Sequence, residues 1–207
     1  MNDYFLNLNK EIETDFIVEL EQYAQYNNVP IVTKEGLELI KLLIKLNKCT
    51  RILEVGTAIG YCSINMALLN EQISIDTIER KEQMFQKAVE NVKKIGLDKR
   101  INLIKADALE VDMLLLKPEY DLIFIDAAKA QYRRFFEKYS PLLKKGGIIV
   151  SDNLLFHGLV EKDEIEGKDL RALIRKIKNY NTWLFENEQF DTTFLRIGDG
   201  MAISIKR

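Results

Sequence analysis

Oxygen-bearing side chains follow two predicted strands of this chain, each at the point where the strand ends. Asp126 comes directly after the apolar run 122–125. Asp152 and Asn153 come directly after the run 147–151. Parallel strands bring their carboxyl ends to one edge of a sheet, where open α/β sheets bind ligands. Two carboxylates and an amide are donors that a hard cation such as Mg²⁺ prefers. The sequence therefore predicts an enzyme with a divalent metal site at this edge.

A glycine-containing turn follows the first predicted strand, in the segment Glu54-Val55-Gly56-Thr57-Ala58-Ile59-Gly60. Glycines let the backbone turn sharply and approach a ligand closely. The spacing differs from G-x-G-x-x-G, and Glu54 would repel a pyrophosphate. Glu79 ends the next strand, where it can accept ribose hydroxyls, and Asp107 with Ala108 ends the third, facing an adenine edge. We therefore predict S-adenosylmethionine, a cationic nucleoside, rather than NAD, although each acid alone would also suit a solvated strand end.

The elements expected to position these side chains are short apolar strands that alternate with amphipathic helices. Two helices come first, over 10–27 and 33–47. Strands are predicted over 51–55, 73–78, 101–105, 122–125 and 147–151, and further helices over 61–69, 83–95, 109–116, 132–143 and 169–179. This alternation predicts a parallel sheet covered on both faces. The end differs, because 182–188, 193–197 and 201–206 have the pattern of strands around a tight turn at Gly198-Asp199-Gly200.

Length and composition indicate one globular domain of 207 residues, without repeats or linkers. Within it we expect an N-terminal helical cap over 1–48 and a catalytic core over 49–207. The 30 basic and 32 acidic residues give no overall charge that would favour nucleic acid. No apolar stretch approaches the roughly 20 residues of a membrane span, so no membrane partner is expected. Cys49 and Cys62 are too few for a disulfide framework, and we expect a cytoplasmic protein.

Four segments carry motifs of one known family. They are E-V-G-T-A-I-G-Y, F-I-D-A-A-K-A-Q-Y-R-R-F-F-E, S-D-N-L-L-F-H-G-L-V and F-L-R-I-G-D-G-M-A-I-S-I-K-R. From about residue 30 to its end the chain resembles the metal-dependent O-methyltransferases of the catechol and caffeoyl-CoA type. The resemblance implies a Rossmann-like class I methyltransferase, α/β, with a seven-stranded mostly parallel sheet, an antiparallel C-terminal hairpin and extra N-terminal helices. Within that group it is most similar to the bacterial tRNA 5-hydroxyuridine methyltransferases, which implies tRNA as substrate and a homodimer joined by the N-terminal helices.

The same resemblance implies roles for the residues at the strand ends. Asp126, Asp152 and Asn153 match the metal ligands, and Asp126 also matches a neighbour of the cofactor's methionine part. Lys129 matches the lysine that acts as general base in the catechol branch. The alternative for Lys129 is a charge that orients the substrate or caps the loop.

The resemblance also implies the cofactor-binding residues, which are Val32, Glu54, Gly56, Cys62, Glu79, Asp107, Ala108 and Asp126. Val32 would touch the cofactor from the N-terminal side. Cys62 stands where the family usually has a serine that meets the cofactor carboxylate. A thiol is a weaker donor, so we expect that contact to pass to the backbone N–H of Cys62 or to Ser63.

Metal chelation alone leaves the methyl acceptor open, because catechols and 5-hydroxyuridine both offer two neighbouring oxygens. The first hypothesis is Mg²⁺-dependent methyl transfer to 5-hydroxyuridine in tRNA, and the second is transfer to small catechol-like phenols. A third, from another class, is a non-catalytic RNA- or nucleotide-binding module. Basic runs at Arg133-Arg134, Lys144-Lys145 and 168–178 are candidate phosphate contacts, although most such runs are solvated helix faces. His157, the one histidine, is expected at the surface near the pocket mouth.

Overall fold

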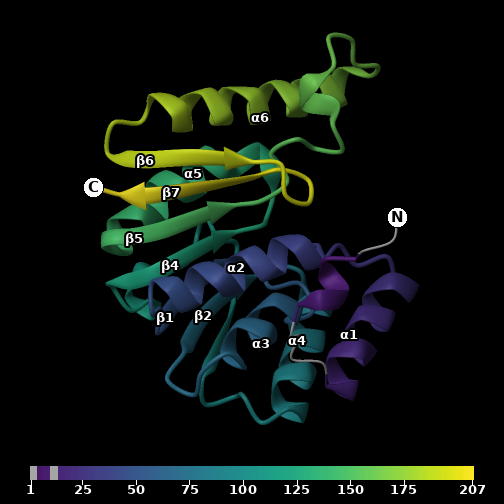
Figure 1. Ribbon diagram of the computed structural model, residues 1–207, viewed down its shortest axis with the longest axis vertical. Helices are drawn as coiled ribbons and strands as arrows, with labels where there is room; N and C mark the ends of the chain where they lie inside the picture. The colour runs from purple at the N-terminus through teal and green to yellow at the C-terminus, as the bar shows by residue number, and fades with distance from the viewer. Residues whose placement is uncertain (1–3, 10–13) are drawn as a thin grey trace.

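The computed structural model describes residues 4–9 and 14–207, and its framework is one seven-stranded sheet (Figure 1). The spatial order of the strands is β3-β2-β1-β4-β5-β7-β6. Strands β1 to β5 are parallel, whereas β7 is antiparallel to β5 and to β6. The bounds are β1 Arg51–Val55, β2 Ser74–Glu79, β3 Ile101–Lys105, β4 Tyr120–Ile125, β5 Leu143–Ser151, β6 Phe190–Leu195 and β7 Met201–Lys206. The predicted mostly parallel sheet with an antiparallel C-terminal hairpin is confirmed.

Helices cover both faces of the sheet (Figure 1). In the described residues they are α1 Asp15–Tyr26, α2 Lys34–Leu46, α3 Tyr61–Ala67, α4 Glu82–Lys94, α5 Tyr132–Tyr139 and α6 Lys168–Glu186, with 3₁₀ turns η1 Leu6–Leu8, η2 Met113–Leu115, η3 Lys129–Gln131, η4 Ser140–Leu142 and η5 Leu159–Glu161. Successive side chains of a strand point to opposite faces. Ile52 therefore packs in the core beneath α1 to α4, whereas Leu53 packs in the core beneath α5 and α6.

The two N-terminal helices begin at threonine caps. The Thr14 side chain accepts a hydrogen bond from the Ile17 N–H, and the Thr33 side chain accepts one from the Gly36 N–H. The predicted helix over 33–47 is confirmed as α2. The helix expected over 10–27 is described as α1, and residues 10–13 lie outside the described residues. Both α1 and α2 pack on α3.

Two helix predictions were too long. Over 109–116 the structure has only the 3₁₀ turn η2, in which the Asp112 carboxylate accepts the Leu114 N–H at 2.9 Å. Leu114 and Leu115 are 91% and 56% exposed whereas Val111 and Leu116 are buried, so the apolar residues here do not form the single buried face of a helix. The helix expected over 132–143 ends at Tyr139, and Pro141 lies in the 3₁₀ turn that follows.

The strand predicted over 182–188 was wrong, because α6 continues to Glu186. Buried residues recur at helical spacing along it, namely Ile174, Ile177, Tyr180 and Leu184. The aromatic residues Trp183 and Phe185 favour strands by propensity. Packing of the helix on α5 and on the sheet overrides that preference, and β6 starts only at Phe190.

Two further expectations concern the chain as a whole. Within residues 4–9 and 14–207, no helix combines the length and the apolar character needed to cross a membrane. Cys49 and Cys62 are both free and buried, in agreement with the expected lack of a disulfide framework.

Candidate active site at the carboxyl edge of the sheet

The structure brings Asp126 and Asp152 to neighbouring positions at the carboxyl edge. Strands β4 and β5 pair in parallel with Ile125 opposite Ser151, and the two acids are the next residues. The Asp126 N–H donates to the Val55 carbonyl at 3.0 Å, and the Asp152 N–H donates to the Ile125 carbonyl at 3.2 Å. Both acids are therefore fixed by an extension of the strand ladder.

One lysine faces these two acids. The Lys129 ammonium lies 2.7 Å from Asp126 Oδ1. Asp152 is 3% exposed, and burial, followed by the nearby charge of Asp126, raises its pKa to about 7. Its Oδ1 accepts the backbone N–H of Asn153 at 2.6 Å. Two acids beside one ammonium leave negative charge uncompensated, which a divalent cation would balance.

The donors present are of the kind such a cation takes. Asp126 and Asp152 would supply carboxylate oxygens and Asn153 an amide oxygen, a donor set that suits Mg²⁺. No group of three or more His, Cys, Asp or Glu side chains suited to a metal occurs among the described residues. The predicted set contains only two such side chains, Asp126 and Asp152, because its third member, Asn153, is an amide. It is therefore not a group of that kind.

The glycine turn after β1 touches the backbone of Asp126. Gly56 has a φ of 108°, and a Cβ atom there would lie 2.0 Å from the Asp126 carbonyl oxygen. Only glycine has both the space and the conformation for this position. The turn predicted to bind the cofactor and the strand end predicted to bind the cation are therefore in direct backbone contact.

Glu54 is buried beneath this turn, with one of its oxygens unpartnered. Its Oε2 accepts hydrogen bonds from Thr77 Oγ1 at 2.5 Å and from the Ser63 hydroxyl. Its Oε1 is buried without a hydrogen-bond partner. Burial raises the pKa of Glu54 to about 7, although interactions with the side chains of Ser63, Thr77 and Cys62 oppose the shift. An orphaned carboxylate oxygen fits a ligand that brings a donor or a positive charge, as S-adenosylmethionine does.

The raised pKa of Glu54 predicts a pH-dependent stability. The native protein holds this proton more tightly than the unfolded chain, whose value is near 4.5. The contribution of protonated Glu54 to the free energy of unfolding is therefore fully present below about pH 4.5 and is lost as the pH rises through about 7. Glu54→Gln removes the ionised form and should raise the Tm of the cofactor-free protein at pH 8 by about 5 °C.

Thermal unfolding between pH 4.5 and pH 8 measures this effect. Glu54→Gln should show a weaker decrease in Tm with pH than the wild type, and the exposed control Glu71→Gln should follow the wild type. Parallel curves for all three proteins would contradict the buried ionisation of Glu54.

The predicted ribose and adenine contacts end the next two strands at the same edge. Glu79 is held in place, because Oε2 accepts the Ala58 N–H at 2.9 Å and Oε1 accepts the Lys81 N–H at 2.8 Å. The Asp107 carboxylate accepts the Leu109 N–H at 2.9 Å. Ala108 is buried directly after it.

Val32 and Cys62 are both buried, the first just before α2 and the second in the first turn of α3. The Ser63 hydroxyl is directed at Glu54, which weakens the expectation that it meets a cofactor carboxylate. The backbone N–H of Cys62 is the better candidate for that contact.

Two residues of this network, Thr57 and Thr77, are absent from the predicted site. Ser63 and Thr77 hold Glu54, and Thr77 in turn pairs with Thr57 at 2.6 Å between their hydroxyl oxygens. The available signal was Thr77 itself, a polar residue in the middle of an apolar strand pattern. His157 lies at the surface as expected, with its side chain 80% exposed.

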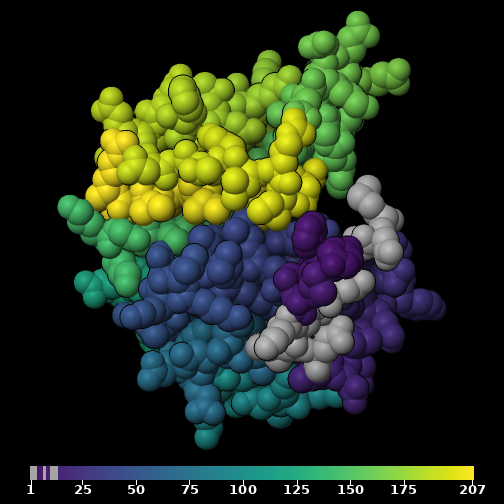
Figure 2. Space-filling view, viewed as in Figure 1, coloured from purple at the N-terminus to yellow at the C-terminus, as the bar shows by residue number. Residues whose placement is uncertain are grey.

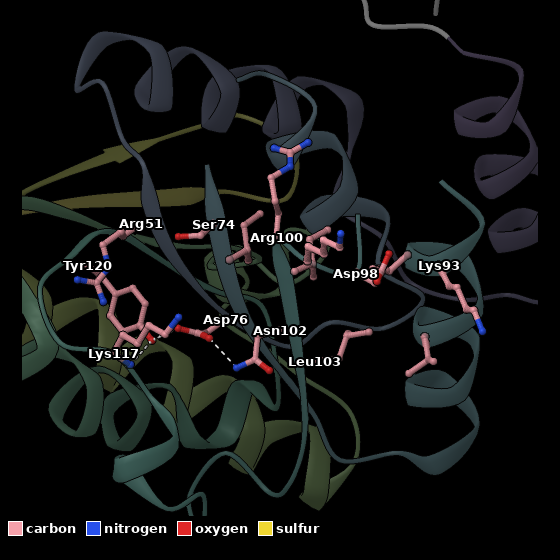
Figure 3. A pocket seen from close by; sticks show the side chains of 15 residues that line it. Arg51, Ser74, Asp76, Lys93, Asp98, Arg100, Asn102, Leu103, Lys117 and Tyr120 are labelled. Atoms are coloured by element: carbon pink, nitrogen blue, oxygen red, sulfur yellow. Dashed lines mark hydrogen bonds between the residues drawn. The ribbon is translucent and has the colours of Figure 1, made fainter. Parts of the chain in front are cut away.

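A cavity of about 630 Å³ lies at the opposite edge, where β1, β2 and β3 begin (Figure 3). Its buried acid, Asp76, accepts hydrogen bonds from Asn102 at 2.8 Å and from the Tyr120 hydroxyl at 2.6 Å (Figure 3). Both oxygens of Asp76 are thus already partnered. Asp126 and Asp152, whose charge is not fully compensated, and the close approach of Gly56 to the Asp126 backbone lie at the carboxyl edge instead. We therefore expect the active site at that edge.

Comparison with known proteins identifies the family of the chain. A family model described as O-methyltransferase matches residues 7–207. A caffeoyl-CoA O-methyltransferase of Populus kitakamiensis is 30% identical over 190 residues, which cover 88% of this chain and 80% of the relative. A crystal structure from Staphylococcus aureus, described as a caffeoyl-CoA O-methyltransferase, has a TM-score of 0.93 at 41% identity and covers 99% of this chain and 98% of its own.

A more distant structure shares the fold. The S-adenosylhomocysteine-bound methyltransferase PaMTH1 of Podospora anserina has a TM-score of 0.86 at 23% identity, over 100% of this chain and 97% of its own. Membership of this enzyme family contradicts the third hypothesis, a non-catalytic RNA- or nucleotide-binding module. The chain belongs to the caffeoyl-CoA O-methyltransferase family and is a class I, S-adenosylmethionine-dependent O-methyltransferase.

Proposed function

We propose that the chain transfers a methyl group from S-adenosylmethionine to the 5-hydroxyl of 5-hydroxyuridine in tRNA, in a Mg²⁺-dependent reaction that gives 5-methoxyuridine. The observation that carries the chemistry is the pair Asp126 and Asp152, adjacent at the carboxyl edge with a single ammonium beside them, which leaves part of their negative charge uncompensated. Choice of tRNA as acceptor is supported by the four sequence motifs and by the basic surface described below.

Asp126, Asp152 and Asn153 hold the cation in this proposal. A bound divalent cation supplies charge that orients two neighbouring acceptor oxygens and favours the ionised hydroxyl. Glu54, Gly56, Glu79, Asp107 and Ala108 hold the cofactor, with Val32 and Cys62 at its periphery. The two sets meet at the backbone contact between Gly56 and Asp126, and this contact supports a proposal in which donor and acceptor bind side by side.

Lys129 is the general base in this proposal, and its replacement by methionine tests the role. Its side chain is 22% exposed and its Nζ contacts Asp126, so Nζ borders the position of the acceptor hydroxyl, whose proton it accepts as the neutral amine. Lys129→Met should lower kcat about 100-fold, because general bases contribute roughly 10²–10⁴-fold. Binding of S-adenosylhomocysteine, measured by calorimetry, should change less than about threefold.

Lys99→Met is the control, since Lys99 lies exposed at the opposite edge of the sheet. A Lys129→Met enzyme with wild-type kcat would exclude the role of base.

A basic surface leads away from the site along α6. Its exposed residues include Arg171, Arg175, Lys176 and Lys178, and α6 follows the loop that begins at Asn153 (Figure 1). Lys144-Lys145 lie instead near the start of β5, at the opposite edge, where Lys144 pairs with Asp121. Of these two basic runs, the one on α6 is the better placed to contact RNA phosphates near the site.

The second candidate acceptor is a small catechol-like phenol. A curated relative is named for activity on caffeoyl-CoA, whose aromatic ring carries the same pair of neighbouring oxygens that 5-hydroxyuridine offers. The cation and cofactor residues would be the same for either acceptor.

Radiolabelled S-adenosylmethionine decides between these acceptors. The enzyme is incubated with tRNA carrying 5-hydroxyuridine or with 3,4-dihydroxybenzoate, with and without EDTA, at 50 and 200 mM salt. Label recovered as 5-methoxyuridine, lost with EDTA and reduced by salt, is the expected result. Label only on the phenol would move the function to small molecules, and label that resists EDTA would contradict the cation site.

We also propose a homodimer joined through the N-terminal helices. Apolar side chains are exposed on α1 and α2, including Tyr26 at 88%, Leu42 at 52% and Leu46 at 69%. Helix α2 lies across the centre of the face shown in Figure 2. Light scattering after gel filtration tests the proposal, and Leu42→Glu with Leu46→Glu should give a monomer.

A further inference from the structure

The loop that follows Asp152 has an unusual backbone. Asn153, Phe156 and His157 have φ angles of 59°, 45° and 57°, and Gly158 follows with 74°. Residues other than glycine pay conformational free energy in this left-handed region, and they stay there only when the surroundings hold them. The loop carries the predicted ligand Asn153 and needs an external support.

The turn between β6 and β7 provides that support. The Leu154 N–H donates to the Gly200 carbonyl and the Leu155 N–H donates to the Asp199 carbonyl, both at 2.9 Å. The His157 N–H donates to the carboxylate oxygen Oδ1 of Asp199 at 2.6 Å. Asp199 therefore holds the loop through its backbone and through its side chain.

The same turn is packed tightly on both sides. A Cβ atom on Gly200 would lie 2.6 Å from Leu155 Cγ, and one on Gly198 would lie 2.5 Å from Thr33 Oγ1. Thr33 caps α2 directly after Val32. The turn is thus fixed between the loop that begins at Asn153 and the segment predicted to touch the cofactor.

Asp199 lies close enough to Asp152 for its charge to act on that carboxylate. Its side chain is 15% exposed, and its second oxygen, Oδ2, has no hydrogen-bond partner but lies 3.7 Å from His157 Nδ1. The charge of Asp199 contributes to the raised pKa of Asp152, after burial and Asp126. The carboxylate is therefore an internal group beside the site.

We propose that Asp199 is a positioning residue for methyl transfer: its Oδ1, by accepting the His157 N–H, fixes the loop that carries Asn153 and borders the acceptor. This role rests on the proposed cation and acceptor site. Asn can supply the same acceptor oxygen as Asp, whereas Ala cannot. The hydrogen bond, rather than the charge, is the property that matters.

The test compares Asp199→Ala and Asp199→Asn with the exposed control Asp163→Ala. Mn²⁺ binding is measured by electron paramagnetic resonance with S-adenosylhomocysteine present, and cofactor binding by calorimetry. Acceptor KM and kcat are measured with whichever of 5-hydroxyuridine tRNA and 3,4-dihydroxybenzoate the wild type methylates. Asp199→Ala should weaken Mn²⁺ binding about tenfold and raise the acceptor KM, with S-adenosylhomocysteine binding within about twofold. Asp199→Asn should restore both values to near wild type.

Two results would overturn the role. Wild-type Mn²⁺ affinity and acceptor KM in Asp199→Ala would show that the bond does not position the loop. Asparagine as damaging as alanine would show that the charge acts instead. A wild-type enzyme that needs no divalent cation would refute the proposed cation site, and the acceptor KM of Asp199→Ala would then decide the role of Asp199.

Discussion

Asp152→Asn should lower kcat by about 1,000-fold and, in EDTA, make the protein more stable. In the proposed site, loss of the carboxylate would weaken the hold on the cation, whose charge would stabilise the transition state by several kcal/mol. The same carboxylate is buried beside Asp126, and its pKa of about 7 means that its ionisation opposes folding at pH 8. Asparagine keeps the acceptor oxygen for the Asn153 N–H and removes the charge. The Tm in EDTA at pH 8 should therefore rise by about 3 °C or more.

Steady-state kinetics and thermal unfolding measure the two effects, with Asp163→Asn as an exposed control. Binding of S-adenosylhomocysteine should stay within about threefold of the wild type, because Asp152 is not among the predicted cofactor residues. Opposite changes in activity and stability distinguish a cation ligand from a structural acid. A variant that is inactive and also less stable would instead indicate that Asp152 supports the fold.

Gly56→Ala should destabilise the protein by more than about 4 kcal/mol and abolish cofactor binding. The new Cβ would lie 2.0 Å from the Asp126 carbonyl oxygen, and the backbone there cannot retreat without breaking the ladder between β1 and β4. Urea unfolding and S-adenosylhomocysteine calorimetry measure the loss.

Gly146→Ala is the matched control. Gly146 has a φ of 74°, but nothing lies within 4 Å of a Cβ there. It should lose only the roughly 1–2 kcal/mol of a left-handed residue and keep the cofactor affinity. Equal losses in the two variants would attribute the effect to conformation rather than to the contact with Asp126.

Elements with a strong periodic pattern could be predicted from the sequence. Strand β1 was predicted with its observed bounds, and the order of strands and helices along β1 to β5 indicated the parallel sheet correctly. The segment 182–188 could not be assigned from local preference, because Tyr180 and Leu184 are buried by partners distant in the sequence. Tertiary packing decides such a segment.

The candidate site was predictable where strand ends carry it and unpredictable where side chains meet across the fold. The adjacency of Asp126 and Asp152 follows from parallel pairing, which the sequence pattern indicates. Thr77 lies 23 residues from Glu54 in the chain, and Asp199 lies 42 residues from His157. No local pattern relates such pairs, so their hydrogen bonds require the folded structure.

The contact between Gly56 and Asp126 has a thermodynamic consequence. With no side chain between them, the turn and the strand end share one rigid backbone unit, so a ligand that orders one orders the other. We expect the cofactor and the cation to bind with positive cooperativity. Linkage makes that coupling reciprocal: the factor by which Mg²⁺ tightens S-adenosylmethionine binding equals the factor by which S-adenosylmethionine tightens Mg²⁺ binding.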